Sequence, residues 1–200
     1  MKLSVLTLAV WLAAAAAFAQ PSPQAQFEAG QFEQTLASLA PVIADPAADP
    51  SSHFLAVQAA LRLEQPGRAA PSLAALGANP APGWQLVGQS VQALMSGDMA
   101  CAVGCAERAV SANPNLFAAH YQLGLGLARA ERWAAAASAF EQALALDPSF
   151  AYAAYYAGLS YSKISRADKT AEYFERFLRM APSAPERAGV QSIMRTLRGR

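Results

Sequence analysis

The sequence predicts an all-α protein made of helix-turn-helix repeats of 34 residues, and two observations support this fold class. Five prolines recur at that interval along the chain, namely Pro46, Pro80, Pro114, Pro148 and Pro182. Proline has no backbone N–H and ends helices, so equal spacing indicates one structural unit repeated end to end. Between the prolines, apolar residues recur at helical spacing and no alternating strand pattern occurs.

The unit from Phe117 to Phe150 shows the pattern most clearly. A polar Glu131-Arg132 turn divides it into two helices, and Asp147-Pro148 closes it. The first helix is expected to carry the apolar and small residues Tyr121, Leu123, Gly124 and Leu127, and the second Ala136, Phe140, Ala143 and Leu144.

Small residues occupy the position of Gly124 in successive units, and large rings recur at the position of Phe140. The small positions are Ala56, Ser90, Gly124 and Gly158, and the rings are Phe140 and Phe174. We expect the small residues to let the two helices of each unit approach closely and the rings to fill the space between units.

These residues resemble the tetratricopeptide-repeat family, whose pattern contains a Leu-Gly pair, a mid-unit Ala, an aromatic residue and a closing Pro. Leu123-Gly124, Ala136, Phe140, Ala143 and Pro148 match it, and the following unit repeats the match with Gly158, Phe174 and Pro182. The resemblance is specific from residue 83 to 184 and degenerate from 27 to 82. It implies a right-handed superhelix of stacked hairpins.

The repeat interval divides the chain into seven segments. We expect a signal peptide at 1–19, a partial first repeat at 20–48, a degenerate repeat at 49–82, three repeats at 83–116, 117–150 and 151–184, and a capping helix with a basic tail at 185–200. Pro41 is expected to break the second helix of the first repeat, and Pro66 and Pro71 to interrupt the next repeat.

The first nineteen residues have the pattern of a secretory signal peptide. Lys2 precedes an apolar run from Leu3 to Phe18, and small residues at Ala17 and Ala19 predict cleavage before Gln20. An uncleaved membrane anchor is the alternative, although the run is short and a proline-rich segment follows at once. The signal predicts an exported protein, periplasmic or at the cell surface, with no transmembrane helix after its removal.

The C-terminal segment is predicted to cap the array. Ser183-Ala184-Pro185-Glu186 has the pattern of a capping box, and the stripe Val190, Ile193, Met194 and Leu197 can cover the last repeat. Residues 163–200 hold nine basic and four acidic side chains. This basic end is either a solvated helix or a weak contact for an acidic surface.

Charge and motifs argue against nucleic-acid binding and catalysis. Without Lys2 the chain has 14 basic and 14 acidic side chains, so it lacks the positive charge of a nucleic-acid binder. His53 and His120 lie far apart in apolar helical stretches, and no catalytic triad, phosphate loop or zinc spacing occurs. No enzyme activity and no cofactor are predicted, and both histidines are expected to be structural.

The resemblance implies a concave groove lined by the first helix of each unit. Carried over by position, the lining residues would be Trp84, Val87, Val91 and Met95, then Tyr121, Leu125 and Arg129, then Tyr152, Tyr155, Leu159 and Lys163. Aromatic residues and arginine are enriched in protein-binding patches, so the groove is predicted to bind an extended or helical segment of another protein. The alternative is that these rings pack between hairpins.

A second hypothesis concerns four sulfur-containing residues near one turn, Met95, Met99, Cys101 and Cys105. Thiolate and thioether ligands together favour Cu(I), and two cysteines one helical turn apart can also form a strained disulfide. A pair of small buried residues is the third interpretation. The main expectation is a non-catalytic scaffold or adaptor of the cell envelope, and the soft-metal or thiol-redox module is its alternative.

Overall fold

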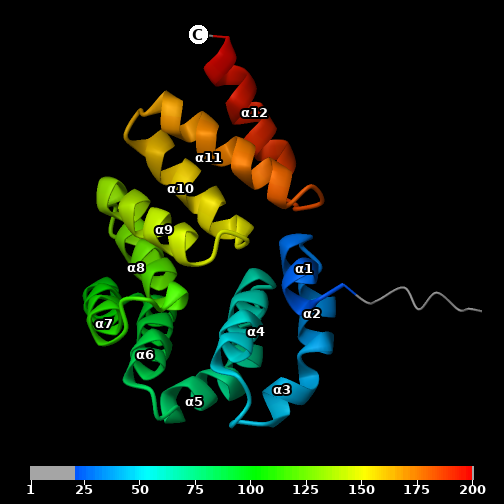
Figure 1. Ribbon diagram of the computed structural model, residues 1–200, viewed down its shortest axis with the longest axis vertical. Helices are drawn as coiled ribbons and strands as arrows, with labels where there is room; N and C mark the ends of the chain where they lie inside the picture. Colours follow the sequence, from blue (N-terminus) through cyan, green and yellow to red (C-terminus); the bar gives the residue numbers. More distant parts are fainter. Residues whose placement is uncertain (1–20, 200) are drawn as a thin grey trace, which may run out of the picture.

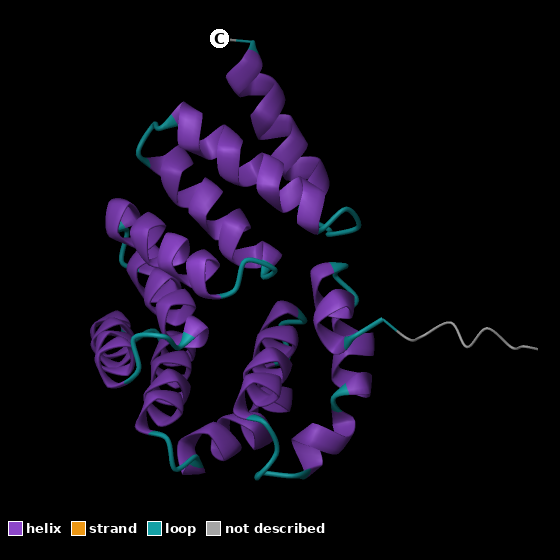
Figure 2. Ribbon diagram, viewed as in Figure 1, coloured by secondary structure: helices purple, strands orange, loops and turns teal. Residues whose placement is uncertain are grey.

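The computed structural model describes residues 21–199, and within them the chain is helical, with no strand. Figures 1 and 2 show one continuous succession of short helices. The helices are α1 (Pro23–Glu28), α2 (Phe32–Ser38), α3 (Ala40–Ala44), α4 (Pro50–Arg62), a 3-10 turn (Pro66–Ala69), α5 (Ala70–Ala78), α6 (Pro82–Ser96), α7 (Met99–Ala112), α8 (Phe117–Arg129), α9 (Trp133–Leu146), α10 (Ala151–Lys163), α11 (Ala167–Met180) and α12 (Arg187–Arg198). The predicted signal peptide lies outside the described residues.

Consecutive helices pair as hairpins, and the same turn closes each hairpin. A residue in the left-handed region follows the first helix of every unit, with φ of 75° at Gly30, 57° at Glu64, 81° at Gly97, 57° at Glu131 and 59° at Ser165. In each case the next backbone N–H donates back to the last helical turn, as from Arg132 to the carbonyl of Leu127 at 2.8 Å. This arrangement satisfies carbonyls that the helix end would otherwise leave unpaired. The same turn also occurs in the two N-terminal units, whose sequences match the repeat pattern poorly. These units are therefore built as repeats as well.

Close contact between a glycine and a phenylalanine holds two of the hairpins together. A Cβ added at Gly124 would lie 2.6 Å from the ring of Phe140, and one added at Gly158 would lie 2.5 Å from the ring of Phe174. Both rings are fully buried. The small and large positions of the repeat therefore face each other within one unit, and the phenylalanine ring occupies the space that a side chain on the glycine would need.

The first two units depart from regular hairpins at their prolines. The second helix of the first unit is divided at Leu39 into α2 and α3, and Pro41 lies in the first turn of α3. In the next unit, Pro66 begins a 3-10 turn that leads into the short α5, where Pro71 again lies in the first turn. Proline is tolerated in a first turn, because the N–H that it lacks would be unpaired there.

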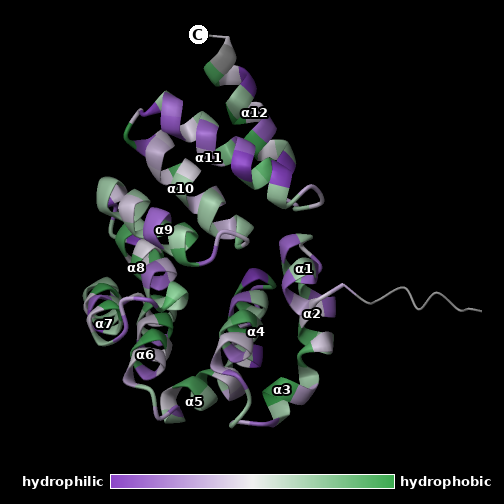
Figure 3. Ribbon diagram, viewed as in Figure 1, coloured by the Kyte–Doolittle hydropathy of each residue, from purple (hydrophilic) through white to green (hydrophobic). Residues whose placement is uncertain are grey.

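The end helix α12 packs on α11, but it does not begin as the sequence predicts. Val190 and Met194 are buried against the last repeat. The predicted capping box is wrong: α12 begins at Arg187, and no side-chain hydrogen bond caps it. The carboxylate of Glu186 is instead held by Arg62 and the hydroxyl of Tyr152. Figure 3 shows hydrophilic residues gathered on α11 and α12, in line with the polar C-terminal segment.

The array curves until its first unit touches its last. Figure 1 shows α1 beside the start of α10 and the loop that leads into α12. Phe27 stacks on Phe150 with ring centroids 5.7 Å apart and meets Tyr152 edge-on at 5.1 Å. The carboxyl group of Glu28 accepts a hydrogen bond from the backbone N–H of Ala151, at the N-terminus of α10, at 3.1 Å. The concave face is thus enclosed by the chain's own N-terminal hairpins.

Candidate functional site

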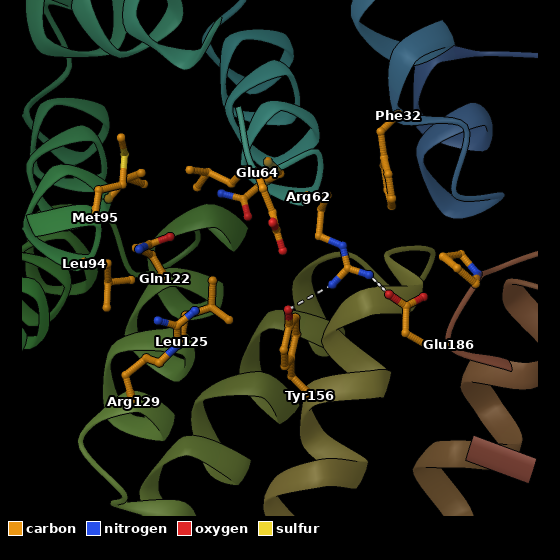
Figure 4. Close-up of a pocket in the computed structure, with 14 residues that line it drawn as sticks. Phe32, Arg62, Glu64, Leu94, Met95, Gln122, Leu125, Arg129, Tyr156 and Glu186 are labelled. Carbon is orange, nitrogen blue, oxygen red and sulfur yellow. Dashed lines mark hydrogen bonds and ion pairs between the residues drawn. The ribbon is translucent and has the colours of Figure 1, made fainter. Parts of the chain in front are cut away.

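Enclosure of the concave face leaves a cavity of about 590 Å³ that residues from both ends of the array line, which we call the central cavity. Figure 4 shows the side chains that line it, contributed by α2, α4, α6, α8, α10 and the loop before α12. The lining residues are Phe32, Gln58, Leu61, Arg62, Glu64, Val91, Leu94, Met95, Gln122, Leu125, Arg129, Tyr156, Pro185 and Glu186.

Arg62 links the two ends of the array at the edge of the cavity. Its Nη1 donates to the hydroxyl of Tyr156 at 3.2 Å, and its guanidinium pairs with the carboxylate of Glu186 (Figure 4). The same group lies 4.4 Å over the ring of Tyr152 and 5.4 Å over that of Phe32. A guanidinium that is stacked on rings and paired with a carboxylate is held in one orientation.

Electrostatics favour the charged form of Arg62. Burial alone would lower the pKa of its guanidinium, but the neighbouring Tyr156 and Tyr152 hydroxyls more than offset this effect and keep the pKa above its ordinary value. Burial also raises the pKa of the Tyr152 hydroxyl and holds that of Tyr121 well above its usual range, so both tyrosines stay neutral. The cation is therefore balanced by Glu186 and by ring faces.

Two further charges at the cavity are unpaired. Arg129, at the end of α8, and Glu64, after α4, are exposed and have no hydrogen-bond or ion-pair partner among the described residues. Leu94, Met95 and Leu125 form an apolar wall on one side of the same cavity, and Met95 is 41% exposed. The cavity thus offers a cation, an anion and an apolar surface without internal partners.

Two glutamine side chains on the cavity wall are buried and unpartnered. Gln58, on α4, is 5% exposed and Gln122, on α8, is 1% exposed. The Nε2 of Gln58 and the Oε1 of Gln122 are enclosed without a hydrogen-bond partner in the described part of the chain. Such groups are uncommon in folded proteins because each loses its hydrogen bonds with water on burial.

Of the eleven residues predicted to line an open groove, four line the central cavity. They are Val91, Met95, Leu125 and Arg129, and they come from the first helices of two neighbouring units, α6 and α8. Met95, Leu125 and Arg129 are accessible there, whereas Val91 is only 1% exposed. Their role in partner binding stays a prediction.

Three of the predicted groove residues lie in the interior instead. Val87, Tyr121 and Tyr152 are at most 2% exposed, so no partner can reach them in this conformation. Phe54 of α4 packs edge-on against Tyr121 at 6.1 Å, and Phe27 of α1 packs against Tyr152. The expectation of a fully open groove is thus corrected, because the N-terminal hairpins cover these rings.

The other four predicted residues lie outside the central cavity. Trp84 packs 6.3 Å from Phe54 at the far end of α6, and Tyr155 and Leu159 are half-buried on α10. Lys163 is exposed, with its ammonium 5.4 Å over the ring of Trp133. None of these four residues lines the central cavity with Arg129.

Sequence reasoning missed the cavity residues contributed by the degenerate N-terminal units. Gln58 and Arg62 lie one helical turn apart on the apolar helix α4, and Gln122 lies among the apolar residues of α8. Polar side chains in register on an apolar helix face are the signal that could have identified them.

Of the four sulfur-containing residues, the two cysteines lie together, whereas Met95 lines the central cavity and neither cysteine does. Sγ of Cys101 and Sγ of Cys105 lie 3.6 Å apart as free thiols, while Met95 lines the central cavity. Burial and the adjacent Cys101 thiol raise the pKa of Cys105, which disfavours the thiolate that a metal needs. Among the described residues no group of three or more His, Cys, Asp or Glu side chains could hold a metal ion.

Both histidines make contacts that stabilise the fold. The ring of His53 is buried, with Nδ1 3.2 Å from the Ser72 hydroxyl and Nε2 3.0 Å from the carbonyl of Asp45. Nε2 of His120 lies 2.8 Å from the carbonyl of Pro114. These contacts tie helices to neighbouring turns.

Within the described residues, no helix has both the length and the apolarity to cross a bilayer.

Comparisons with known proteins identify the fold. Residues 117–150 match the sequence profile of the tetratricopeptide repeat family. The chain is similar in structure to the first tetratricopeptide-repeat domain of Spaghetti (RPAP3) bound to an HSP90 peptide, with a TM-score of 0.55 and 18% identity over 60% of this chain and 94% of that chain. The fold is that of stacked tetratricopeptide repeats.

Another solved structure extends the similarity along the array. YrrB, a tetratricopeptide-repeat protein with an unusual peptide-binding site, gives a TM-score of 0.53 and 22% identity over 85% of this chain and 88% of that chain. The first such domain of human RPAP3 gives 0.54 and 19%, over 60% of this chain and 93% of that chain. At these identities the likeness concerns the fold. A search of curated proteins gave no match.

Proposed function

We propose that this tetratricopeptide-repeat array is a non-catalytic scaffold that binds a segment of a partner protein in the central cavity. The observation that carries the proposal is the cavity itself, which combines unpaired charges on Arg129 and Glu64 with the exposed apolar side chain of Met95.

The size and chemistry of the cavity suit a peptide. Ligand pockets range from roughly 300 to 1,000 Å³ and combine apolar walls with a few polar groups, and 590 Å³ lies within this range. Arg129 can pair with a carboxylate and Glu64 with a cationic group, while the wall of Leu94, Met95 and Leu125 accepts an apolar side chain. The similar structures of the RPAP3 domain with an HSP90 peptide and of YrrB with its peptide-binding site support this assignment.

The compartment is part of the proposal. The apolar run after Lys2 and the small residues before Gln20 support export, and hence a partner among proteins of the cell envelope. N-terminal sequencing of the protein recovered from an envelope fraction tests this step. A mature chain that begins at Gln20 supports it, and an intact Met1 in the cytoplasm contradicts it.

Peptide binding is tested with two matched double variants. Met95→Glu with Leu125→Glu places charges on the apolar wall, whereas Ser138→Glu with Gln142→Glu adds the same charges to exposed positions of α9. The wild-type protein is used to select binders from a displayed library of random peptides, and the affinity of each selected peptide is then measured.

We expect the cavity variant to bind the selected peptides more weakly by at least about tenfold and the α9 variant to bind as the wild type does. Circular dichroism reports whether each variant is folded. Equal loss in both variants, or no loss in either, would reject the central cavity as the binding site.

A further inference from the structure

The two buried glutamines of the central cavity remain without a role in the fold described above. Gln58 and Gln122 come from different repeat units, yet both line the same cavity. Neither amide has a hydrogen-bond partner among the described residues. Figure 4 shows the amide of Gln122 on the cavity wall, between Leu94 and the end of α4.

Each glutamine amide carries both a donor and an acceptor. In this conformation Nε2 of Gln58 and Oε1 of Gln122 are the enclosed atoms without a partner. A half-turn about the last side-chain torsion exchanges nitrogen and oxygen, so either amide can turn a donor or an acceptor toward the cavity. A peptide main chain requires this combination, because each peptide unit carries one N–H donor and one C=O acceptor.

From this geometry we infer that Gln58 and Gln122 bind the main chain of the partner segment, and that the segment is extended rather than helical. A helix uses its own N–H and C=O groups internally, so it has none to offer to side-chain amides along its length. An extended segment leaves these groups free. This inference rests on the proposed function and names the conformation of the ligand.

If the glutamines bind the main chain, different residues of the cavity bind different parts of the segment. The two amides fix the register of the backbone without regard to sequence, while the wall formed by Leu94, Met95 and Leu125 selects an apolar side chain. A water molecule at each glutamine is the competing way to satisfy these groups. The two possibilities differ in what the loss of the amides does to peptide binding.

The test uses the full chain and a fluorescein-labelled heptapeptide, the tightest binder selected from a random library. Gln58→Leu and Gln122→Leu, singly and together, remove the amides at nearly constant volume. Gln142→Leu, on the exposed face of α9, is the matched control. A series of peptides with one N-methylated amide at each position removes the main-chain donors one by one.

We expect the double variant to bind about tenfold or more weakly, and the Gln142→Leu control to bind unchanged. N-methylation at one position is expected to weaken binding to the wild type but not to Gln122→Leu, since the two changes remove the same hydrogen bond. A selected peptide that becomes helical on binding, or equal affinity for the double variant, would overturn the inference.

The outcomes separate this inference from the proposed function. If the glutamine variants bind normally while Met95→Glu with Leu125→Glu does not, the cavity binds peptides and only the main-chain role is wrong; water then satisfies the amides. If the library yields no peptide that binds the wild type, both are wrong.

Discussion

Arg62 and Glu186 form an ion pair that joins the end of α4, the first helix of the second repeat unit, to the loop before the capping helix. The side chains are 22% and 16% exposed, so the pair is mostly buried. It closes the array on itself, and Tyr156 and Tyr152 add hydrogen bonds to either side of it. The pair therefore links α4 to the C-terminal end of the array across the concave face.

Breaking this pair from one side is expected to destabilise the protein. Arg62→Met leaves the Glu186 carboxylate buried without its cation, and the free energy of unfolding should fall by about 2 to 4 kcal/mol. Adding Glu186→Met removes the stranded charge and should recover most of the loss. Urea unfolding of the two single variants and the double variant measures the coupling. Additive losses would show that the pair does not hold the ends together.

The contact of Gly124 with Phe140 predicts opposite effects for two glycine substitutions. Gly124→Ala places a methyl group 2.6 Å from the Phe140 ring and should cost about 1 to 3 kcal/mol by overpacking. Gly104 lies in the interior of α7, and no atom lies within 4 Å of a methyl group added there. Gly104→Ala should therefore raise the free energy of unfolding by about 0.5 to 1 kcal/mol. Thermal unfolding of both variants compares them. A neutral Gly124→Ala would contradict the packing described here.

The repeat was predictable from the sequence because the interactions that define it form between residues close together in the chain. Proline at a fixed interval ends a helix wherever it occurs, and a glycine such as Gly124 can meet Phe140 within a single hairpin. The predicted fold class is confirmed, and the C-terminal repeats follow the pattern closely.

Closure of the array was not predictable in the same way. A repeat pattern describes how a unit meets its neighbour, whereas the contact of Phe27 with Phe150 depends on the curvature accumulated over all the units between them. This is why Tyr121 and Tyr152 were expected on an open groove and are found beneath α4 and α1.

Glu28 gives the closure a dependence on pH. Burial raises the pKa of its carboxyl from 4.5 to about 8; the N–H of Ala151 acts in the opposite direction, and Asp147 adds to the rise. Between these two values the folded protein holds a proton that the unfolded chain has lost, so this group's contribution to stability is full below about 4.5 and is lost as the pH rises through about 8.

Glu28→Gln keeps an acceptor for the Ala151 N–H but cannot ionise. We expect the variant to lose less stability than the wild type between about pH 5 and about pH 8, measured as the urea midpoint at each pH. Other carboxylates contribute equally to both proteins and cancel in the comparison. Parallel pH profiles would show that Glu28 is ionised in the folded state and that the closure does not depend on its proton.

Gln122 is expected to show a trade-off between stability and binding. Its enclosed Oε1 has no partner in the described part of the chain, so replacement by leucine removes an unsatisfied group from the interior. Gln122→Leu should therefore raise the free energy of unfolding by about 1 kcal/mol in the absence of peptide. A glutamine whose amide served only the fold would instead destabilise the protein when it was lost. Urea unfolding with and without the selected heptapeptide distinguishes the two, because the peptide should stabilise the wild type more than the variant.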